Sequence, residues 1–280
     1  MTDLKNVPFL LDLLDDESEV VRSEVQEALK KLGPVFKTAI APLWLEMTAV
    51  QKQQLELIWQ EIKLETFEIY WGQWLEEEDE SLALENALYA LAILESRIED
   101  PDLRTLLDEL ADEFRLMNLR QEVPLLMRFL FRTKAYRSPK KEYYHPRNSN
   151  LVQVILQKEG LQISLSCLAI LVGRRLGIKI NGFNMPGHFM VMADTPEGSR
   201  VFDVFNQGVA LHPKSVEQLS KAMELPGSAL DRLRANTHEI VLRVLRNIIK
   251  AHERKGNAES ARRYKFHFDG LLQKIKTIGE

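Results

Sequence analysis

The sequence predicts a predominantly helical α+β protein that contains one small antiparallel sheet. Apolar residues recur at helical spacing through most of the chain up to residue 177. The period then changes, because short β-type runs follow at residues 179–185, 188–193 and 200–205, with turn residues between the last two. Helical spacing resumes in residues 236–280. These observations predict a helix packed on a sheet, with helical segments on both sides.

Composition restricts the class of protein. With 280 residues, of which 45% are hydrophobic, the chain can bury a sizeable core and is expected to divide into two or three packed units. Its single cysteine, Cys167, excludes an intrachain disulfide and a Cys-rich zinc site. The apolar runs are far shorter than the roughly 20 residues of a membrane span, and the first residues do not have the pattern of a signal peptide. We therefore expect a cytoplasmic protein without a membrane partner.

Charge is distributed unevenly along the chain. Residues 1–122 contain 11 Lys and Arg against 28 Asp and Glu, whereas residues 123–280 contain 26 against 13. An acidic segment that is covalently linked to a basic one is expected to dock on it. A nucleic-acid surface on the basic part is the alternative, but its charges are spread around the helices and few aromatic residues lie among them. We expect no nucleic-acid partner.

The first 33 residues contain a helical pair that resembles a HEAT repeat. Apolar residues follow helical spacing on both sides of Asp15-Asp16, and Gly33-Pro34 ends the second helix. Because HEAT units stack, the resemblance implies a helical region over residues 1–80 and further helices at about 37–47, 51–63, 66–76 and 81–98. An irregular helical bundle is the alternative, since no second copy of the repeat is visible.

The middle of the chain predicts three further helices and a loop. Residues 102–135 carry an apolar stripe that is typical of one amphipathic helix. Residues 136–147 have no periodicity and are expected to form a loop. Helices are predicted over residues 151–158 and from Ile163 to Gly177.

Five short motifs carry a resemblance to a known family. They are Tyr144-x-Pro146-Arg147-Asn148-Ser149-x-Leu151, Gly160-x-x-Ile163-Ser164-Leu165-Ser166, Arg174-Arg175-Leu176-Gly177, Pro186-Gly187-His188-Phe189 and Phe202-Asp203-x-Phe205-Asn206. Over about residues 85–255 the chain resembles the SirB-type transglutaminase-like family. The resemblance implies a small papain-like or transglutaminase-like α/β core, which we assign to residues 81–235. Residues 236–280 resemble a tetratricopeptide-like (TPR-like) helical hairpin.

In such a core, the chemistry depends on three groups. A thiol at a helix N-terminus ionises readily, a histidine moves the proton, and a carboxylate orients the imidazole. The resemblance assigns the last two roles to His188 and Asp203. The nucleophile of transglutaminases lies about 15 residues before the Leu-Gly that ends the helix. Counted back from Gly177 of this chain, that position is Gln162. A glutamine amide cannot act as a nucleophile.

Two other side chains near Gln162 are candidates for the nucleophile. Cys167 lies five residues further on, which turns it by about 140° around the helix axis, within an apolar run. We expect it to be a buried packing residue, and nucleophile is the alternative role. Ser164 is expected to cap or pack the helix start. We assign Asn148, Ser164 and Asn206 to binding or orienting roles at the site.

The register of the strands bears on whether His188 and Asp203 meet. If the turn between their strands is centred on Glu197, a plain hairpin places His188 opposite Asn206 and turns Asp203 to the other face. A contact between His188 and Asp203 then requires a bulge or an uneven loop. Asn206 is the alternative orienting group.

Two functional interpretations follow. In the first, the protein is a pseudoenzyme, a non-catalytic regulatory module that binds a protein or peptide and could also form homo-oligomers. In the second, it is a cysteine or serine amide hydrolase or acyltransferase that uses His188 and Asp203. We prefer the first interpretation, and the sequence does not decide whether the protein is an enzyme. The other histidines lack the spacing of metal ligands, and no Walker loop or dinucleotide fingerprint occurs, so we expect neither metal nor cofactor.

Overall fold

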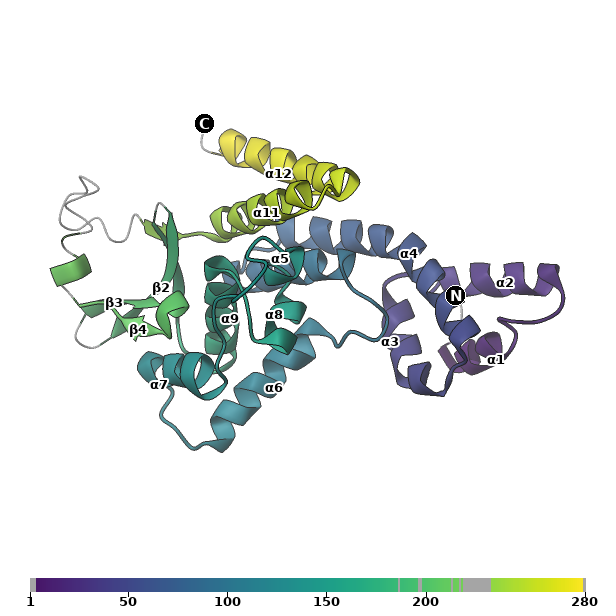
Figure 1. Ribbon diagram of the computed structural model, residues 1–280, viewed down its shortest axis with the longest axis horizontal. Helices are drawn as coiled ribbons and strands as arrows, with labels where there is room; N and C mark the ends of the chain where they lie inside the picture. The colour runs from purple at the N-terminus through teal and green to yellow at the C-terminus, as the bar shows by residue number, and fades with distance from the viewer. Residues whose placement is uncertain are drawn as a thin grey trace. The chain divides into compact units, whose positions relative to one another are not determined.

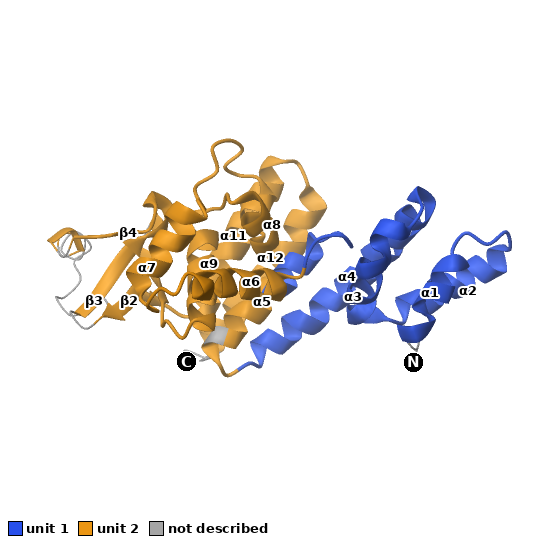
Figure 2. Cartoon of the chain, turned by 90° about the horizontal axis from the view of Figure 1, so that it is seen from below, with its two compact units in different colours: residues 1–77, 89–101 blue, residues 78–88, 102–280 orange. Residues whose placement is uncertain are grey.

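The computed structural model describes residues 4–278 except 186, 196–197, 213, 217 and 219–232 (Figure 1). The chain forms two compact units, residues 1–77 with 89–101 and residues 78–88 with 102–280 (Figure 2). The described residues are mostly helical and include one small antiparallel sheet, which confirms the predicted α+β class. None of their helices combines the length and the apolar content that a bilayer crossing requires.

The first unit is helical throughout its regular structure. Its elements are η1 (Leu4–Asn6), α1 (Val7–Asp12), α2 (Glu19–Lys30), η2 (Gly33–Val35), α3 (Phe36–Ile40), η3 (Ala41–Glu46) and α4 (Ala49–Leu75). The core of this unit includes Phe36, which stacks on Trp59 of α4 with ring centroids 6.1 Å apart. The Trp59 indole N–H also donates to the carbonyl of Ser96 over 3.0 Å, which ties residues 89–101 to α4.

Helix α4 differs from the expectation of two helices over residues 51–63 and 66–76. It is continuous over Ala49–Leu75, and a capping box between Thr48 and Gln51 defines its start. Thr66 lies where the break was expected, but its hydroxyl donates to the carbonyl of Ile62 over 2.9 Å. This bond keeps the polar side chain within the helical backbone, so Thr66 does not interrupt the helix.

The second unit begins with α5 (Glu80–Leu94), whose later residues belong to the first unit, and continues with α6 (Leu103–Leu116), α7 (Val123–Arg128) and a π-helical turn, η4 (Phe129–Thr133). The prediction of a single helix over residues 102–135 is therefore wrong. Asn118 has φ +51°, which ends α6 in a left-handed conformation. Pro124 then lies in the first turn of α7, where its fixed φ suits a helix start.

Helix α9 (Gln162–Arg175) lies at the centre of the second unit. Before it come η5 (Pro146–Asn148) and α8 (Leu151–Gln157). Every residue of α9 from Ile163 to Gly173 is buried, because α6, α7, α8, α11 and strand β2 all pack against it (Figure 1). Gly173 allows the close approach on one side, since a Cβ there would lie 2.8 Å from Ile180 Cδ1.

The sheet comprises β1 (Asn181–Met185), β2 (His188–Thr195), β3 (Gly198–Asp203), β4 (Val209–Ala210) and β5 (Arg234–Ala235). Among the described residues its order is β4-β3-β2-β1-β5, and all neighbouring strands are antiparallel. The three longer strands lie where the sequence predicted them. The two-residue edge strands β4 and β5 were not predicted, because so short a run has no periodicity to detect. Met190 and Met192 of β2 are buried in the core, together with Phe183 and Val201.

The C-terminal residues form a helical hairpin of α11 (Thr237–Arg254) and α12 (Ala258–Ile278), as predicted. A capping box between Asn236 and Glu239 starts α11. His252 and His267 are buried in this hairpin, which differs from the surface positions that a polar residue type suggests. His252 stacks on Tyr264 with ring centroids 5.5 Å apart, so its ring contributes apolar contact area.

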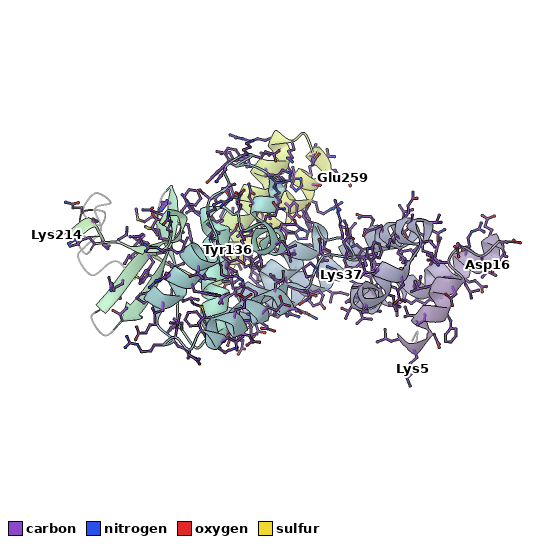
Figure 3. The ribbon with its side chains drawn as sticks, turned by 60° about the horizontal axis from the view of Figure 1, so that its bottom comes forward. Lys5, Asp16, Lys37, Tyr136, Lys214 and Glu259 are labelled. Carbon is purple, nitrogen blue, oxygen red and sulfur yellow. The ribbon has the colours of Figure 1, made fainter. Side chains whose placement is uncertain are left out.

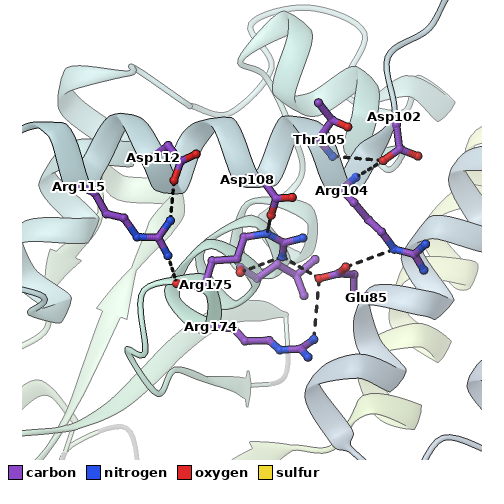
Figure 4. A network of polar contacts seen from close by, with 10 residues as sticks. Glu85, Asp102, Arg104, Thr105, Asp108, Asp112, Arg115, Arg174 and Arg175 are labelled. Carbon is purple, nitrogen blue, oxygen red and sulfur yellow. Dashed lines mark hydrogen bonds and ion pairs between the residues drawn. The ribbon is translucent and has the colours of Figure 1, made fainter. Parts of the chain in front are cut away.

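A buried ionic network joins α5, α6 and the C-terminal end of α9 (Figure 4). The Glu85 side chain is only 8% exposed and lies 2.7 Å from Arg175, 3.4 Å from Arg104 and 3.8 Å from Arg174. Arg175 also pairs with Asp108. Although burial disfavours its charge, the hydrogen bonds to Glu85 and Asp108 raise the pKa of Arg175. Positive charge at a helix C-terminus is additionally favoured by the helix dipole.

Replacing Glu85 should destabilise the second unit strongly. We expect Glu85→Ala to lower the free energy of unfolding by about 2 to 4 kcal/mol, because the arginines then lose their buried counter-charge. Asp112→Ala is the matched control, since Asp112 pairs with Arg115 but is 68% exposed, and it should cost less than about 1 kcal/mol. Urea unfolding followed by circular dichroism measures both. Equal effects of the two substitutions would contradict the structural importance of the Glu85 network.

The α11–α12 hairpin should make stability depend on pH through His267. Burial lowers the pKa of His267 from 6.5 to about 4, and the nearby charge of Arg263 acts in the same direction. The unfolded chain therefore binds a proton as the pH falls below 6.5, and the folded chain does not until about pH 4. Stability is lost across this window, by at most about 1.4 kcal/mol per pH unit.

The test compares wild type with His267→Gln between neutral pH and about pH 5. The variant should lose less of its free energy of unfolding over this range, because its amide does not titrate. Lys265→Gln, an exposed substitution on the same helix, should keep the wild-type pH dependence. A His267→Gln variant with an unchanged pH profile would show that His267 is not the titrating group.

Candidate functional site

The site predicted from the sequence lies at the N-terminus of α9, and the preceding chain fixes where this helix begins. Tyr136, buried in the second unit (Figure 3), precedes a loop whose residue Arg137 accepts a hydrogen bond from Gly160 N through its carbonyl over 3.0 Å. The next residue, Leu161, donates its backbone N–H to the carbonyl of Asn148 over 3.1 Å. Gln162 is then the first helical residue.

Asn148 is the residue that joins the loop to the helix start. Its side-chain Nδ2 donates to the carbonyls of Glu142 and Tyr143 over 2.9 and 3.0 Å. Its own carbonyl accepts from the hydroxyl of Ser164 over 2.9 Å as well as from Leu161. Asn148 and Ser164 are both buried. The structure thus places these two predicted site residues inside the scaffold, where they position α9.

His188 and Asp203 are in direct contact. His188 is the first residue of β2 and Asp203 the last of β3, and Nε2 of the imidazole lies 3.1 Å from Oδ1 of the carboxylate. The same Oδ1 accepts the backbone N–H groups of Phe205 and Asn206 over 3.0 and 3.1 Å. A proton on Nε2 would lie between the ring and this carboxylate, and a neutral ring with that proton would have Nδ1 as its acceptor. The side chain of His188 is 30% exposed.

The register explains why no bulge is needed for this contact. Thr195 pairs with Gly198 and Val191 with Phe202, one residue away from the expected register. If this pairing is extended to the strand ends, His188 lies opposite Phe205. The side chains of Asp203 and His188 are then on the same face of the sheet. The expected pairing of His188 with Asn206 is therefore wrong. Residues 196 and 197, at the expected centre of the turn, and residue 186 of the Pro186-Gly187 motif lie outside the described residues.

Gln162 lies beside this pair. Its side-chain Oε1 accepts the backbone N–H of Phe189 over 3.3 Å, so the amide is held against the strand residue that follows His188. The structure therefore links Gln162 of α9 to Phe189 of β2, the residue after His188, while the His188 imidazole contacts Asp203 of β3. Asn206 is exposed and contacts Asp203 through its backbone N–H.

The possible nucleophiles of α9 are enclosed by the protein. Cys167 is 1% exposed, and burial raises the pKa of its thiol to about 12. A thiol with so high a pKa is protonated at neutral pH and reacts slowly. The Ser164 hydroxyl donates to Asn148, and Ser166 is completely buried. These residues pack the helix and do not face solvent beside His188.

Arg243 of α11 contributes to the site and was not predicted from the sequence. Its Nη1 donates to the Asn184 side chain over 2.7 Å and to the carbonyl of Met185 over 3.2 Å. Its guanidinium carbon lies 5.3 Å from the ring centroid of Phe189. Burial, together with the charge of Arg246, lowers the pKa of Arg243. Arg243 thus holds the ends of β1 and β2 next to His188. In sequence it is one of many basic residues on an amphipathic helix, with no local signal of this role.

A His-Asp pair on adjacent strands, beside the N-terminus of a buried helix, is the arrangement that thiol-dependent acyl transfer requires apart from the thiol. Fold and site together define a transglutaminase-like protein. The sequence model of the transglutaminase-like superfamily matches residues 101–246, which is more than half of the chain. The protein therefore belongs to the transglutaminase-like superfamily.

Several curated proteins are similar to the chain. A UPF0162 protein from Xylella fastidiosa (strain 9a5c) is 36% identical over 197 residues, which cover 64% of this chain and 68% of the relative. A UPF0162 protein from Pseudomonas aeruginosa is 29% identical over 119 residues, 41% of this chain and 43% of the relative. Human F-box only protein 21 is 25% identical over 139 residues, 47% of this chain and 22% of the relative. No solved structure matches the chain significantly.

The geometry at position 162 leads to a test of the site. A cysteine in place of Gln162 would lie at the start of α9 beside the His188 imidazole, and both surroundings lower the pKa of a thiol. We expect Gln162→Cys to react with iodoacetamide at neutral pH at least about tenfold faster than Ala258→Cys, which places a thiol at the exposed start of α12 without a histidine partner. Mass spectrometry follows the labelling.

Two further samples complete this experiment. Wild type should remain unlabelled, because its single cysteine is buried with a pKa of about 12. Gln162→Cys combined with His188→Ala should react no faster than Ala258→Cys. If the enhanced rate persists without His188, or if Gln162→Cys never shows one, position 162 does not correspond to the nucleophile position.

Proposed function

We propose that the protein is a non-catalytic binding module of the transglutaminase-like superfamily, whose Gln162-His188-Asp203 site recognises a group of a protein or peptide. The observation that carries this proposal is that Gln162, at the position that the family resemblance assigns to the nucleophile, accepts a hydrogen bond from Phe189 N, while His188 and Asp203 are in contact. An amide cannot form the covalent acyl intermediate of this chemistry.

The polar groups of the site match those of a peptide unit. His188 is partly exposed, and a neutral ring that carries its proton on Nε2, towards Asp203, would offer Nδ1 as an acceptor for a ligand N–H. The Gln162 side chain carries two N–H donors, while its oxygen is engaged by Phe189. A peptide group offers one donor and one acceptor, so it can bond to both residues. Asp203 maintains the ring orientation that such a contact needs.

The alternative is a cysteine or serine amide hydrolase or acyltransferase that uses His188 and Asp203. The intact contact between these residues favours it, because the pair could act as general base. Its nucleophile would have to come from Cys167 or Ser164, and both are buried away from solvent. We therefore place binding ahead of catalysis.

The finer assignments belong to the same proposal. The five motifs support a SirB-type member of the superfamily. The α1–α2 pair supports a HEAT-like N-terminal region over residues 1–80, and the α11–α12 hairpin supports a TPR-like region over residues 236–280. The binding core would then be residues 81–235. Helical repeats commonly offer surfaces to proteins, which agrees with a protein or peptide ligand.

The test uses a displayed library of random heptapeptides selected on the immobilised full-length chain. We expect peptides that bind wild type, and whose binding is weakened about tenfold or more by His188→Ala and by Gln162→Ala. Gln157→Ala removes an exposed glutamine side chain from α8 and should leave binding unchanged. Selected peptides should keep their mass after incubation with wild type and hydroxylamine.

Two outcomes would overturn the proposal. Cleavage of the peptide, or formation of its hydroxamate, would establish acyl transfer and the alternative function. Binding that is equally strong in His188→Ala, Gln162→Ala and Gln157→Ala, or no selection at all, would show that this site does not recognise peptides.

A further inference from the structure

A cavity of about 370 Å³ lies at the other end of α9, one helix length from Gln162. Its walls come from α5, α9, the segment before β1, β1 itself, β5 and α11, all within the second unit. We propose that this cavity is a second binding site, for a small organic acid. The carboxylate would be held by Arg174 and Asn181, and the apolar body would lie against Leu84, Ile170 and Ile240.

The donors in the cavity wall are the first argument. Arg174 Nη1 is buried, and its ion pair with Glu85 Oε2 has a length of 3.8 Å, beyond hydrogen-bond distance. Asn181 Nδ2 is also buried, and neither atom has a hydrogen-bond partner among the described residues. Buried donors without a partner are rare in folded proteins. Both atoms belong to side chains that line the cavity, and a small rotation of each side chain would turn its donor towards an acceptor that enters from outside.

The acidic residues nearby already have partners, so they do not oppose an anion as free carboxylates would. Glu80 lines the cavity, but its Oε2 accepts the backbone N–H of Thr237 over 2.9 Å, and its carbonyl accepts the Thr237 hydroxyl over 2.8 Å. Glu85 is engaged by Arg175 and Arg104. Lys179 adds a further positive charge to the wall. Cationic donors of this kind bind carboxylates more strongly than neutral acceptors.

The remaining wall specifies the rest of the ligand. Leu84, Ile170 and Ile240 are buried aliphatic residues in the cavity wall. A volume of about 370 Å³ lies within the range of small-molecule sites. The combination of a cationic end and an aliphatic wall fits a monocarboxylate with a short apolar body. This site does not depend on the His188 site, because it lies at the opposite end of α9 and uses different residues.

The test titrates 4-phenylbutyrate into the full chain with labelled isoleucine δ1 methyl groups, followed by NMR. We expect saturable shifts at the four isoleucines of the wall, which are Ile170 of α9, Ile178 and Ile180 of the segment that follows it, and Ile240 of α11. The neutral amide 4-phenylbutanamide has nearly the same shape and should bind at least about tenfold more weakly. The same titration followed by calorimetry gives both dissociation constants.

Variants distinguish the carboxylate contacts from a general charge effect. Arg174→Gln and Asn181→Leu should each weaken 4-phenylbutyrate binding about tenfold, while Arg174→Lys should weaken it less. Arg246→Gln removes the same charge from the exposed face of α11 and should leave binding unchanged. Thermal melting checks the folding of each variant. If Arg174→Gln does not fold, the binding of Asn181→Leu and Arg174→Lys decides the test.

Three results would overturn the proposal. The first is equal affinity for the acid and the amide. The second is a set of shifts confined to methyl groups outside the cavity wall. The third is the absence of saturable shifts at millimolar 4-phenylbutyrate.

Discussion

The burial of α9 on all sides is the constraint on which the second unit depends. All residues from Ile163 to Gly173 are enclosed by neighbouring helices and β2. A buried polar side chain in this stretch is costly unless it bonds inside the protein, as the Ser164 hydroxyl does, whereas the buried Ser166 hydroxyl has no hydrogen-bond partner among the described residues. Polar chemistry is therefore confined to the two ends of the helix. Gln162 lies at one end, and Arg174 and Arg175 lie at the other.

At the N-terminal end, the start of α9 is hydrogen-bonded to β2 next to the contact between His188 and Asp203. The Asn148 carbonyl anchors the helix start, and Asp203 orients His188 through a contact of 3.1 Å. Gln162 fits this framework because its oxygen accepts the N–H of Phe189. An uncharged side chain thereby connects the first residue of α9 to strand β2. Such rigid support is what a binding site needs to hold its hydrogen-bonding groups in place.

At the C-terminal end, buried charge replaces the apolar packing. Glu85 pairs with Arg175, with Arg104 and, over 3.8 Å, with Arg174, which also lines the cavity. Buried ion pairs seldom add much net stability, but they restrict how helices can be placed, because every misplaced charge is costly. The network therefore sets where α5, α6 and α9 meet. The cavity exists because β1, β5 and α11 close around this polar helix end.

The sequence by itself predicted the α+β class, several of the elements and the candidate site residues. Local periodicity marks α9, the longer strands and the C-terminal hairpin, and the motifs single out His188, Asp203 and Gln162. The expected strand register differs from the observed one by one residue, so the sequence did not explain why His188 contacts Asp203. Only the tertiary structure decided the contact of Arg243 with the β1–β2 end, the burial of His267 and the cavity beside Arg174. These features join segments far apart in the chain, and their energies depend on burial and distance, which the local spacing of residues does not encode.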